Sequence, residues 1–268
     1  MRIGFIGTGA MAQAIARGAV ASGVAPATLV FSNRTPAKAC DLADELGASA
    51  ASSNVSLARQ VDIIILAVKP KDQRAVIKEI SSTVVGRPDV CVASLAAGRT
   101  LDQIATDFGA GIPLVRIMPN VAATVGQSMT AVTASGTTDA QVSAVRSLMD
   151  SVGRTILIDE DYFPVFQALA SCSPAWYFQI VDSFARAGVK YGLPKDSAVE
   201  IAAQAMAGAA ALLLAERENG TIPAQLIDRV TSPGGTTIAG LLAAEEGGLS
   251  TALVGAVDAS IHADSHLG

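Results

Sequence analysis

The chain has 268 residues, of which 50% are hydrophobic and only 16% are charged, and its formal net charge is −5. This composition excludes a disordered protein and predicts a globular chain with a large core. The negative charge, together with a sequence that contains no basic run, argues against binding to nucleic acid, because phosphates would be repelled.

Three features of the sequence lead us to expect a cytoplasmic protein. The first strand pattern begins at Arg2, which leaves no room for a leader peptide. The most apolar stretch, residues 201–215, is too short to cross a bilayer and is expected to be a buried helix. Cys40, Cys91 and Cys172 are odd in number and widely spaced, which fits a reducing compartment better than a disulfide framework or a zinc site.

Short apolar runs alternate with amphipathic stretches in the first half of the chain. We expect strands at residues 3–6, 28–31, 63–68, 90–94 and 114–117, with helices between them. This order is typical of an α/β fold with a doubly wound, mostly parallel sheet of the Rossmann type. We assign this N-terminal domain to residues 1–158.

The second half of the chain has no strand signal after Asp159. Ala- and Leu-rich stretches at residues 163–191 and 195–218 predict long helices, and Gly and Pro in residues 191–194 predict the break between them. These helices are apolar on nearly every face, so a single chain could not bury them. Residues 159–268 are therefore expected to form an all-helical domain that shares its core with a partner in a homodimer.

A glycine-rich turn follows the first expected strand and precedes the first helix. Gly7 permits a tight turn, Gly9 lets the backbone approach a pyrophosphate, and Ala12 allows close packing of helix and strand. An ordinary turn without a ligand is the alternative, but the strand, the helix and the N-terminal location all favour dinucleotide binding. The cofactor residues expected here are Ile6, Gly7, Thr8, Gly9, Ala10 and Met11.

The end of the second strand indicates which dinucleotide binds. An NAD-selective site usually has Asp or Glu at this point, but the chain has Ser32, Asn33, Arg34 and Thr35. Arg34 can pair with a 2′-phosphate while its three neighbours donate hydrogen bonds. This pattern predicts NADPH, with NADH as an alternative cofactor, although Arg34 as a solvated surface charge is the competing interpretation.

Two further segments are expected at the same edge of the sheet, on the nicotinamide side. One ends the strand at residues 63–68 and the other follows the strand at residues 90–94, and ligands bind at the carboxyl ends of such strands. The residues concerned are Ala67, Val68, Lys69 and Pro70 in the first segment and Ala96, Ala97 and Gly98 in the second.

The segment at residues 230–240 joins two helical stretches and has the chemistry of an anion site. Gly234 and Gly235 expose backbone N–H groups, the following helix adds its positive end, and Ser232, Thr236 and Thr237 add hydroxyl groups. The segment therefore predicts a site for a small carboxylate. The alternative is that Thr236 merely caps a helix beginning near Thr237.

Together these motifs resemble those of pyrroline-5-carboxylate reductases, in residues 7–9, 67–70, 116–120 and above all 230–240. The resemblance implies a Rossmann domain, a helical domain interleaved with that of a partner, and NAD(P)H-dependent reduction of the C=N bond of 1-pyrroline-5-carboxylate to L-proline in proline biosynthesis. Dimers form larger rings in some members. By motif position, Asn54 joins the cofactor residues, and the substrate residues are Asn120, Arg229, Val230, Ser232, Gly234, Gly235, Thr236 and Thr237.

The sequence departs from the family pattern in two places. Asn120 is followed by Val121 and Ala122 where the family usually reads Asn-Thr-Pro, and residues 171–173 read Ser-Cys-Ser where the family usually has Gly-Ser-Gly before Pro174. These departures leave two alternatives open, namely a reductase of a related cyclic imine carboxylate and a non-catalytic NADP-binding regulator.

The expected reaction is hydride transfer to the imine carbon, with Thr237 as the candidate for polarising or protonating the nitrogen. The two histidines, His262 and His266, lie near the C-terminus, so a histidine acid is not expected. They could bind a metal together with Asp258, but a solvated terminal helix explains them as well, and no metal is expected.

Other catalytic assignments have less support in the sequence. Cys172 as a nucleophile lacks a histidine partner. Lys190 or Lys195 could serve as the catalytic lysine of a β-hydroxyacid dehydrogenase, but the sequence shows no substrate-loop motif of that type.

Overall fold

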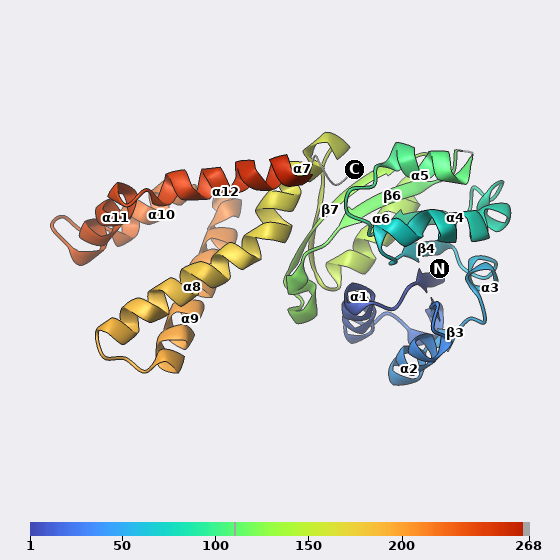
Figure 1. Ribbon diagram of the computed structural model, residues 1–268, viewed down its shortest axis with the longest axis horizontal. Coiled ribbons are helices and arrows are strands. Elements are labelled where there is room, and N and C mark those ends of the chain that lie inside the picture. The colour runs from blue at the N-terminus through green and yellow to red at the C-terminus, as the bar shows by residue number, and fades with distance from the viewer. Residues whose placement is uncertain (110, 265–268) are drawn as a thin grey trace. The chain divides into compact units, whose positions relative to one another are not determined.

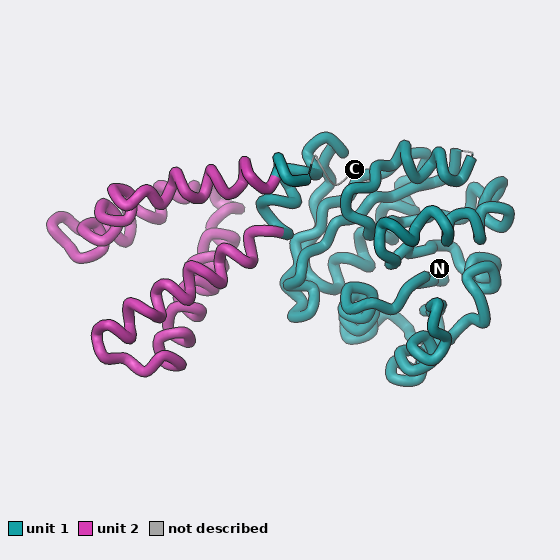
Figure 2. Tube along the Cα trace, in the orientation of Figure 1, with its two compact units in different colours: residues 1–171, 261–268 teal, residues 172–260 magenta. Residues whose placement is uncertain are grey.

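The computed structural model describes residues 1–109 and 111–264, and the chain divides into two compact units (Figure 2). Unit 1 contains residues 1–171 and the C-terminal residues from Ile261 onward, and unit 2 contains residues 172–260. Gln167 Nε2 donates a hydrogen bond to Asp264 Oδ1 over 2.9 Å, so the chain returns to unit 1 close to where it leaves. Residues 159–171, expected in the helical domain, thus belong to unit 1 by their contacts.

Across the described residues, unit 1 contains one eight-stranded sheet with the order β3-β2-β1-β4-β5-β6-β7-β8 (Figure 1). Its parallel central part confirms the expected α/β doubly wound fold, and the strand order reverses at β1, where a ligand crevice forms in such sheets. The expected strands are β1 (Ile3–Ile6), β2 (Leu29–Ser32), β4 (Ile63–Leu66), β5 (Cys91–Ser94) and β6 (Leu114–Met118).

Three strands were not predicted, namely β3 (Ser49–Ala50), β7 (Ser128–Ser135) and β8 (Gly153–Leu157). β7 runs antiparallel to β6, and β8 runs parallel to β7. β3 has only two residues, both exposed, and β8 lies at the sheet edge and is only partly buried. None of the three therefore carries the continuous apolar run of a strand that is buried on both faces.

Helices cover both faces of the sheet, and alternate residues of the strands divide between two cores. Ile63 and Ile65 belong to one core, whereas Ile64 and Leu66 belong to the other. This alternation explains the run of apolar residues in β4, because successive side chains of a strand point to opposite faces. The helices of unit 1 that cover the sheet are α1 (Ala10–Ala21), α2 (Pro36–Leu46), α3 (Asn54–Ala58), α4 (Pro70–Val84), α5 (Leu101–Phe108) and α6 (Asp139–Asp150).

The helix expected over residues 163–191 is not continuous. It consists of α7 (Phe163–Phe166), a π-helical turn (Gln167–Cys172) and α8 (Ser173–Lys190). The expected break at residues 191–194 is confirmed, since Gly192 has a φ of 95° and α9 (Lys195–Glu216) starts directly after Pro194. The remaining helices are α10 (Pro223–Val230), α11 (Thr236–Glu246) and α12 (Leu249–Asp264).

Helix α9 is apolar but exposed within a single chain. The most apolar 18-residue window of the segment Lys195–Asn219 has a mean hydropathy of 1.7, so the segment is long and apolar enough, by length and composition alone, to cross a membrane. Only 6% of its most apolar window is buried. The prediction that residues 201–215 form a buried helix is therefore wrong for the isolated chain, because α8 packs against α9 but leaves most of its surface exposed.

Candidate functional site

The turn between β1 and α1 has the geometry that its glycines predict. Gly7 has a φ of 100°, and its N–H donates to the carbonyl oxygen of Ser32 over 2.8 Å. A Cβ atom at this position would lie 2.7 Å from the carbonyl oxygen of Ala67. Only glycine satisfies both the backbone conformation and this close approach.

The next residues of the turn fit a phosphate ligand. Gly9 is the N-cap of α1, and a Cβ added there would meet no protein atom within 4 Å. The first N–H groups of the helix have no intrahelical acceptor and attract an anion. Thr8 is 3% exposed, and its Oγ1 has no hydrogen-bond partner among the described residues. This combination of open space and unpaired donors is what a dinucleotide pyrophosphate requires.

A cavity of about 370 Å³ opens at this turn. It brings together most of the predicted cofactor residues, namely Ile6, Gly7, Thr8, Gly9, Asn33, Arg34, Thr35, Asn54, Ala67, Val68 and Lys69. It also includes residues that were not predicted, namely Lys38, Lys71, Asp72 and Val76. The predicted residues that do not line it are Ala10, Met11, Ser32, Pro70, Ala96, Ala97 and Gly98.

The cavity lining is strongly cationic, with Arg34, Lys38, Lys69 and Lys71 against the single carboxylate of Asp72. Such a lining suits a ligand with several phosphate groups. Sequence reasoning missed Lys38 and Lys71 because each stands near the start of a helix and resembles an ordinary solvated charge. The signal that could have found them is their position within one helical turn of Arg34 and Lys69.

Hydrogen bonds within the protein hold Ser32 and Asn33 in place. Ser32 Oγ donates to Asn54 Oδ1 over 2.8 Å. Asn33 Oδ1 accepts from the Thr8 N–H over 3.3 Å, and Asn33 Nδ2 donates to the carbonyl oxygen of Thr35 over 3.1 Å. The hydroxyl proton of Ser32 is thus donated within the protein. Asn33 lines the cavity and uses one of its two amide N–H groups on Thr35, so its hydrogen bond to a 2′-phosphate, like that of Arg34, stays a prediction.

Asn54 has a fixed orientation because Glu79 on α4 holds its amide. Asn54 Nδ2 donates to Glu79 Oε2 over 2.7 Å. A carboxylate only accepts hydrogen bonds, so the NH₂ group of Asn54 must face Glu79 and its oxygen must face Ser32. Asn54 lines the cavity, so the second N–H of this NH₂ group can donate to a ligand there.

The predicted carboxylate loop in unit 2 joins α10 to α11. Gly234 has a φ of 69°, and the Gly235 N–H donates to the carbonyl oxygen of Ser232 over 3.0 Å, which makes a tight turn. Helix α11 begins at Thr236, and its N-cap is Gly235 without a side-chain cap. The alternative in which Thr236 caps the helix is therefore wrong. Thr236 and Thr237 are both exposed at the positive end of α11.

Two other predicted substrate residues flank this loop. Val230 ends α10 and is 62% exposed. Arg229 lies one residue earlier and pairs with Glu216, with 3.5 Å between Nη1 and Oε2. This pair is about half exposed on the arginine side, so its contribution to stability is small and the guanidinium remains accessible.

Comparison with known proteins identifies the family. A family model described as pyrroline-5-carboxylate reductase dimerisation matches residues 160–267, and one described as NADP oxidoreductase, coenzyme F420-dependent, matches residues 2–98. The pyrroline-5-carboxylate reductase of Escherichia coli is 38% identical over 258 residues, which cover 96% of this chain and 94% of the relative. The chain belongs to the pyrroline-5-carboxylate reductase family.

Solved structures of pyrroline-5-carboxylate reductases agree with this assignment. The structure from Coxiella burnetii has a TM-score of 0.94 at 31% identity and covers 100% of this chain and 98% of its own. The structure from Streptococcus pyogenes has a TM-score of 0.82 at 37% identity, with 98% of both chains covered. The resemblance found in the sequence is thereby confirmed over the whole chain.

The first segment that departs from the pyrroline-5-carboxylate reductase pattern lies in unit 1, next to the residue that precedes the second. Asn120 Oδ1 accepts from the Ala122 N–H over 3.2 Å, and Asn120 Nδ2 donates to the carbonyl oxygen of Ala170 over 2.8 Å. Ala170 directly precedes Ser171, the first residue of the second departure. The amide of Asn120 thus joins the two altered segments, and its role toward substrate stays a prediction.

The weaker catalytic assignments gain no support from the described residues of this chain. Lys195 Nζ pairs with the carboxylate of Asp182, and Lys190 lies 5.5 Å from the ring centre of Tyr191. Among the described residues no group of three or more His, Cys, Asp or Glu side chains is placed to hold a metal. His266 lies outside the described residues.

Proposed function

We propose that the protein reduces 1-pyrroline-5-carboxylate to L-proline with NADPH, as an oxidoreductase acting on a C=N bond in proline biosynthesis. The observation that carries the proposal is the cationic cavity at the Gly7 turn, which brings Arg34, Lys38 and Lys71 together in the nucleotide-binding half of the chain. The pyrroline-5-carboxylate reductases to which the whole chain is similar support the substrate.

The residues of unit 1 bind and orient the cofactor. Gly7 and Gly9 let the backbone approach the pyrophosphate, and the positive end of α1 attracts it. Arg34 pairs with the 2′-phosphate, and Asn54, held by Glu79, offers its second N–H. When bound, NADPH supplies the hydride for the imine carbon.

The residues of unit 2 bind the substrate. The N-terminus of α11, the N–H groups of Gly234 and Gly235 and the hydroxyl of Ser232 suit the ring carboxylate. The exposed hydroxyl of Thr237, in the first turn of α11, donates a hydrogen bond to the imine nitrogen. This hydrogen bond polarises the neutral imine, and as hydride reaches the carbon the nitrogen takes a proton from the Thr237 hydroxyl, directly or through water. The protein otherwise acts mainly by orienting the two reactants.

The reaction is tested by initial rates of NADPH and NADH oxidation with the five-membered ring substrate and with its six-membered homologue. Rapid turnover of the five-membered ring with NADPH supports the proposal. Turnover of the larger ring alone would keep the reaction class and change the substrate, as the departures at residues 121–122 and 171–173 allow. A pure, folded protein that turns over neither ring would point to the NADP-binding regulator instead.

Thr237→Val is expected to lower kcat about tenfold, because it removes one hydrogen bond to a group that becomes charged, and to leave the KM for NADPH within about twofold. The measurement is steady-state kinetics with each reactant varied in turn. Thr237→Ser is the matched control, because it keeps the hydroxyl and should retain most of the activity. A Thr237→Val variant with the kcat of the wild type would exclude this role.

We further propose that residues 159–268 form a domain that binds substrate and joins two chains into a homodimer. Support comes from the match to the dimerisation model at residues 160–267 and from exposed apolar side chains on α9, such as Ile201 and Leu212. A second copy that covers α9 would explain its hydropathy without a membrane. The protein is accordingly expected to stay in the cytoplasm and to bind no nucleic acid.

Leu212→Glu is expected to convert the dimer into monomers or aggregates, because it places a charge in the proposed interface. Light scattering after size-exclusion chromatography, without detergent, gives the mass. Glu200→Gln, which changes a charge elsewhere on α9, should leave the mass unchanged. A wild-type mass of one chain, or a wild type that requires detergent, would contradict the proposal, and a higher multiple of the dimer would reveal a ring.

A further inference from the structure

The loop that follows β5 is held at its start by a buried pair of polar side chains. Ser94, the last residue of β5, is 1% exposed, and its Oγ accepts hydrogen bonds from the Ala96 N–H over 3.2 Å and from Gln73 Nε2 over 2.6 Å. Gln73 is 0% exposed and lies in the first turns of α4. One hydroxyl thus joins the loop to α4.

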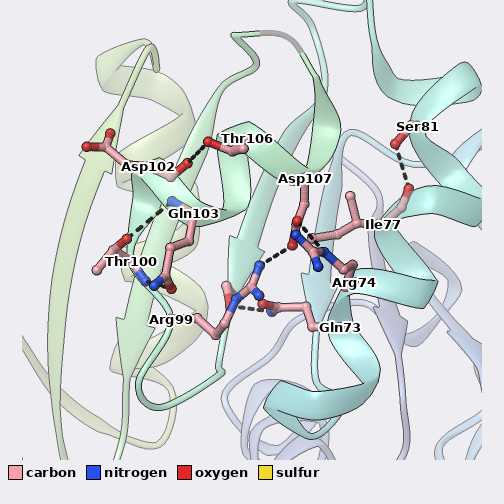
Figure 3. Close-up of polar contacts among 11 residues, drawn as sticks. Gln73, Arg74, Ile77, Ser81, Arg99, Thr100, Asp102, Gln103, Thr106 and Asp107 are labelled. Carbon is pink, nitrogen blue, oxygen red and sulfur yellow. Dashed lines mark hydrogen bonds and ion pairs between the residues drawn. The ribbon is translucent and has the colours of Figure 1, made fainter. Parts of the chain in front are cut away.

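The same loop is held at its end by a buried ion pair (Figure 3). Arg99 follows Gly98, whose φ is 71°, and pairs with Asp107 on α5. The Asp107 side chain is 4% exposed, and its other oxygen accepts from Arg74 Nε over 2.8 Å. Burial would raise the pKa of the Asp107 carboxyl, but the hydrogen bonds from Arg99 and Arg74 keep its pKa below the usual value, so it remains ionised.

The two ion pairs of Asp107 differ in how much they contribute to stability. Asp107 is almost fully buried, and removal of its charge leaves the 19% exposed guanidinium of Arg99 without its anion. Arg74 is 78% exposed, so its ion pair with the same carboxylate contributes little. Only the ion pair between Asp107 and Arg99 therefore constrains the position of the loop.

Only the first residue of the loop, Leu95, has a large side chain, and it packs against the core of unit 1. The residues that follow are Ala96, Ala97 and Gly98, which have no large side chain to fix their position, and Ala97 is exposed. β5 pairs with β4, and Ala67, Val68 and Lys69, which follow β4, line the cofactor cavity. Lys71 and Asp72, directly before Gln73, line it as well. The contacts of Gln73 therefore connect the cavity wall to the neighbouring loop.

We propose that Gln73 and Asp107 are positioning residues that hold residues 95–98 and the first turn of α4 in one fixed arrangement at the nicotinamide end of the cofactor site. Neither side chain lines the cavity, so both act through the backbone of the loop and of the helix. The inference rests on the proposed function, because it assumes that NADPH lies along this edge of the sheet.

Gln73→Leu keeps the volume of the side chain and removes its hydrogen bond to Ser94. We expect kcat to fall about tenfold, because small displacements of reacting groups have large effects on hydride transfer, while the KM for NADPH changes by less than about twofold. The primary isotope effect measured with 4-deuterated NADPH should increase, because the hydride step becomes slower relative to product release. A purely structural role would lower stability without changing this isotope effect.

Asp107→Asn is the second test variant, and Arg74→Ala is the matched control. Asp107→Asn removes the charge that pairs with Arg99. Like Gln73→Leu, it should lower kcat and increase the isotope effect. Arg74→Ala removes only the exposed partner of the same carboxylate and should behave as the wild type. Thermal unfolding of each variant confirms that the measured protein is folded.

The outcomes distinguish this inference from the proposed function. Turnover by the wild type tests the proposed function, and the variants test the inference. Wild-type values of kcat and isotope effect in folded Gln73→Leu and Asp107→Asn, or an equal change in Arg74→Ala, would overturn the inference. If the wild type does not turn over, the emission of bound NADPH reports the nicotinamide environment. A changed emission in Gln73→Leu but not in Arg74→Ala supports the inference, and identical emission in all three proteins overturns it.

Discussion

Replacing Arg34 with alanine should lower kcat/KM for NADPH by about ten- to a hundredfold, the expected effect of losing a charge-assisted hydrogen bond of about 1.5–3 kcal/mol. Activity with NADH should change little, because NADH has no 2′-phosphate. Arg34 bears most of this effect because it carries the only charge among residues 32–35, and the hydroxyl proton of Ser32 is donated within the protein. Initial rates with both cofactors over a range of concentrations give the two values.

The control for this experiment is Arg59→Ala, which removes an exposed cation that does not line the cavity. This variant should leave kcat/KM unchanged for both cofactors. Lys38→Ala should also lower kcat/KM for NADPH, but by less than Arg34→Ala, because an ammonium group lacks the bidentate geometry of a guanidinium. An equal loss of activity with NADPH and NADH in Arg34→Ala would exclude contact with the 2′-phosphate.

Replacing Gly7 with alanine should both destabilise unit 1 and weaken NADPH binding at least tenfold. A φ of 100° is strained for any residue with a side chain and costs about 1–3 kcal/mol. The new Cβ would also lie 2.7 Å from the Ala67 carbonyl oxygen, so β1 and the end of β4 would have to separate. Thermal unfolding and titration with NADPH measure the two effects.

Gly9→Ala is the matched control, because it separates binding from folding. The φ of Gly9 is −72°, and a Cβ there meets no protein atom, so thermal unfolding should not change. NADPH affinity should still fall, because the methyl group occupies space through which the backbone approaches the pyrophosphate. Unchanged affinity in Gly9→Ala would show that the pyrophosphate does not lie over this turn.

Local physical chemistry explains which parts of the fold the sequence could predict. β4 is buried on both faces and therefore has four consecutive apolar residues, Ile63–Leu66. Gly7 is required by a close backbone contact, and Gly192 and Pro194 end one helix and precede the next. In each case the structural requirement acts on a few neighbouring residues, so it leaves a pattern in the sequence.

Features that depend on distant contacts could not be predicted in the same way. β7 runs antiparallel to β6, and only the three-dimensional pairing of their residues defines that direction. Lys38 and Lys71 join the cavity because two different helices begin at the same edge of the sheet. The exposure of most of α9 could not be predicted from its apolar composition either, because burial depends on which elements pack against a helix.

The hydrogen bond between Gln167 and Asp264 has a consequence for the modularity of the protein. The chain leaves unit 1 after residue 171 and re-enters it from Ile261, close to its point of departure. A segment whose two ends are neighbours on a host domain can be exchanged or deleted with little disturbance of that domain. The helical unit is thus arranged as an insertion into unit 1. A short linker that joins residue 171 to Ile261 in its place would leave a nucleotide-binding domain that folds on its own.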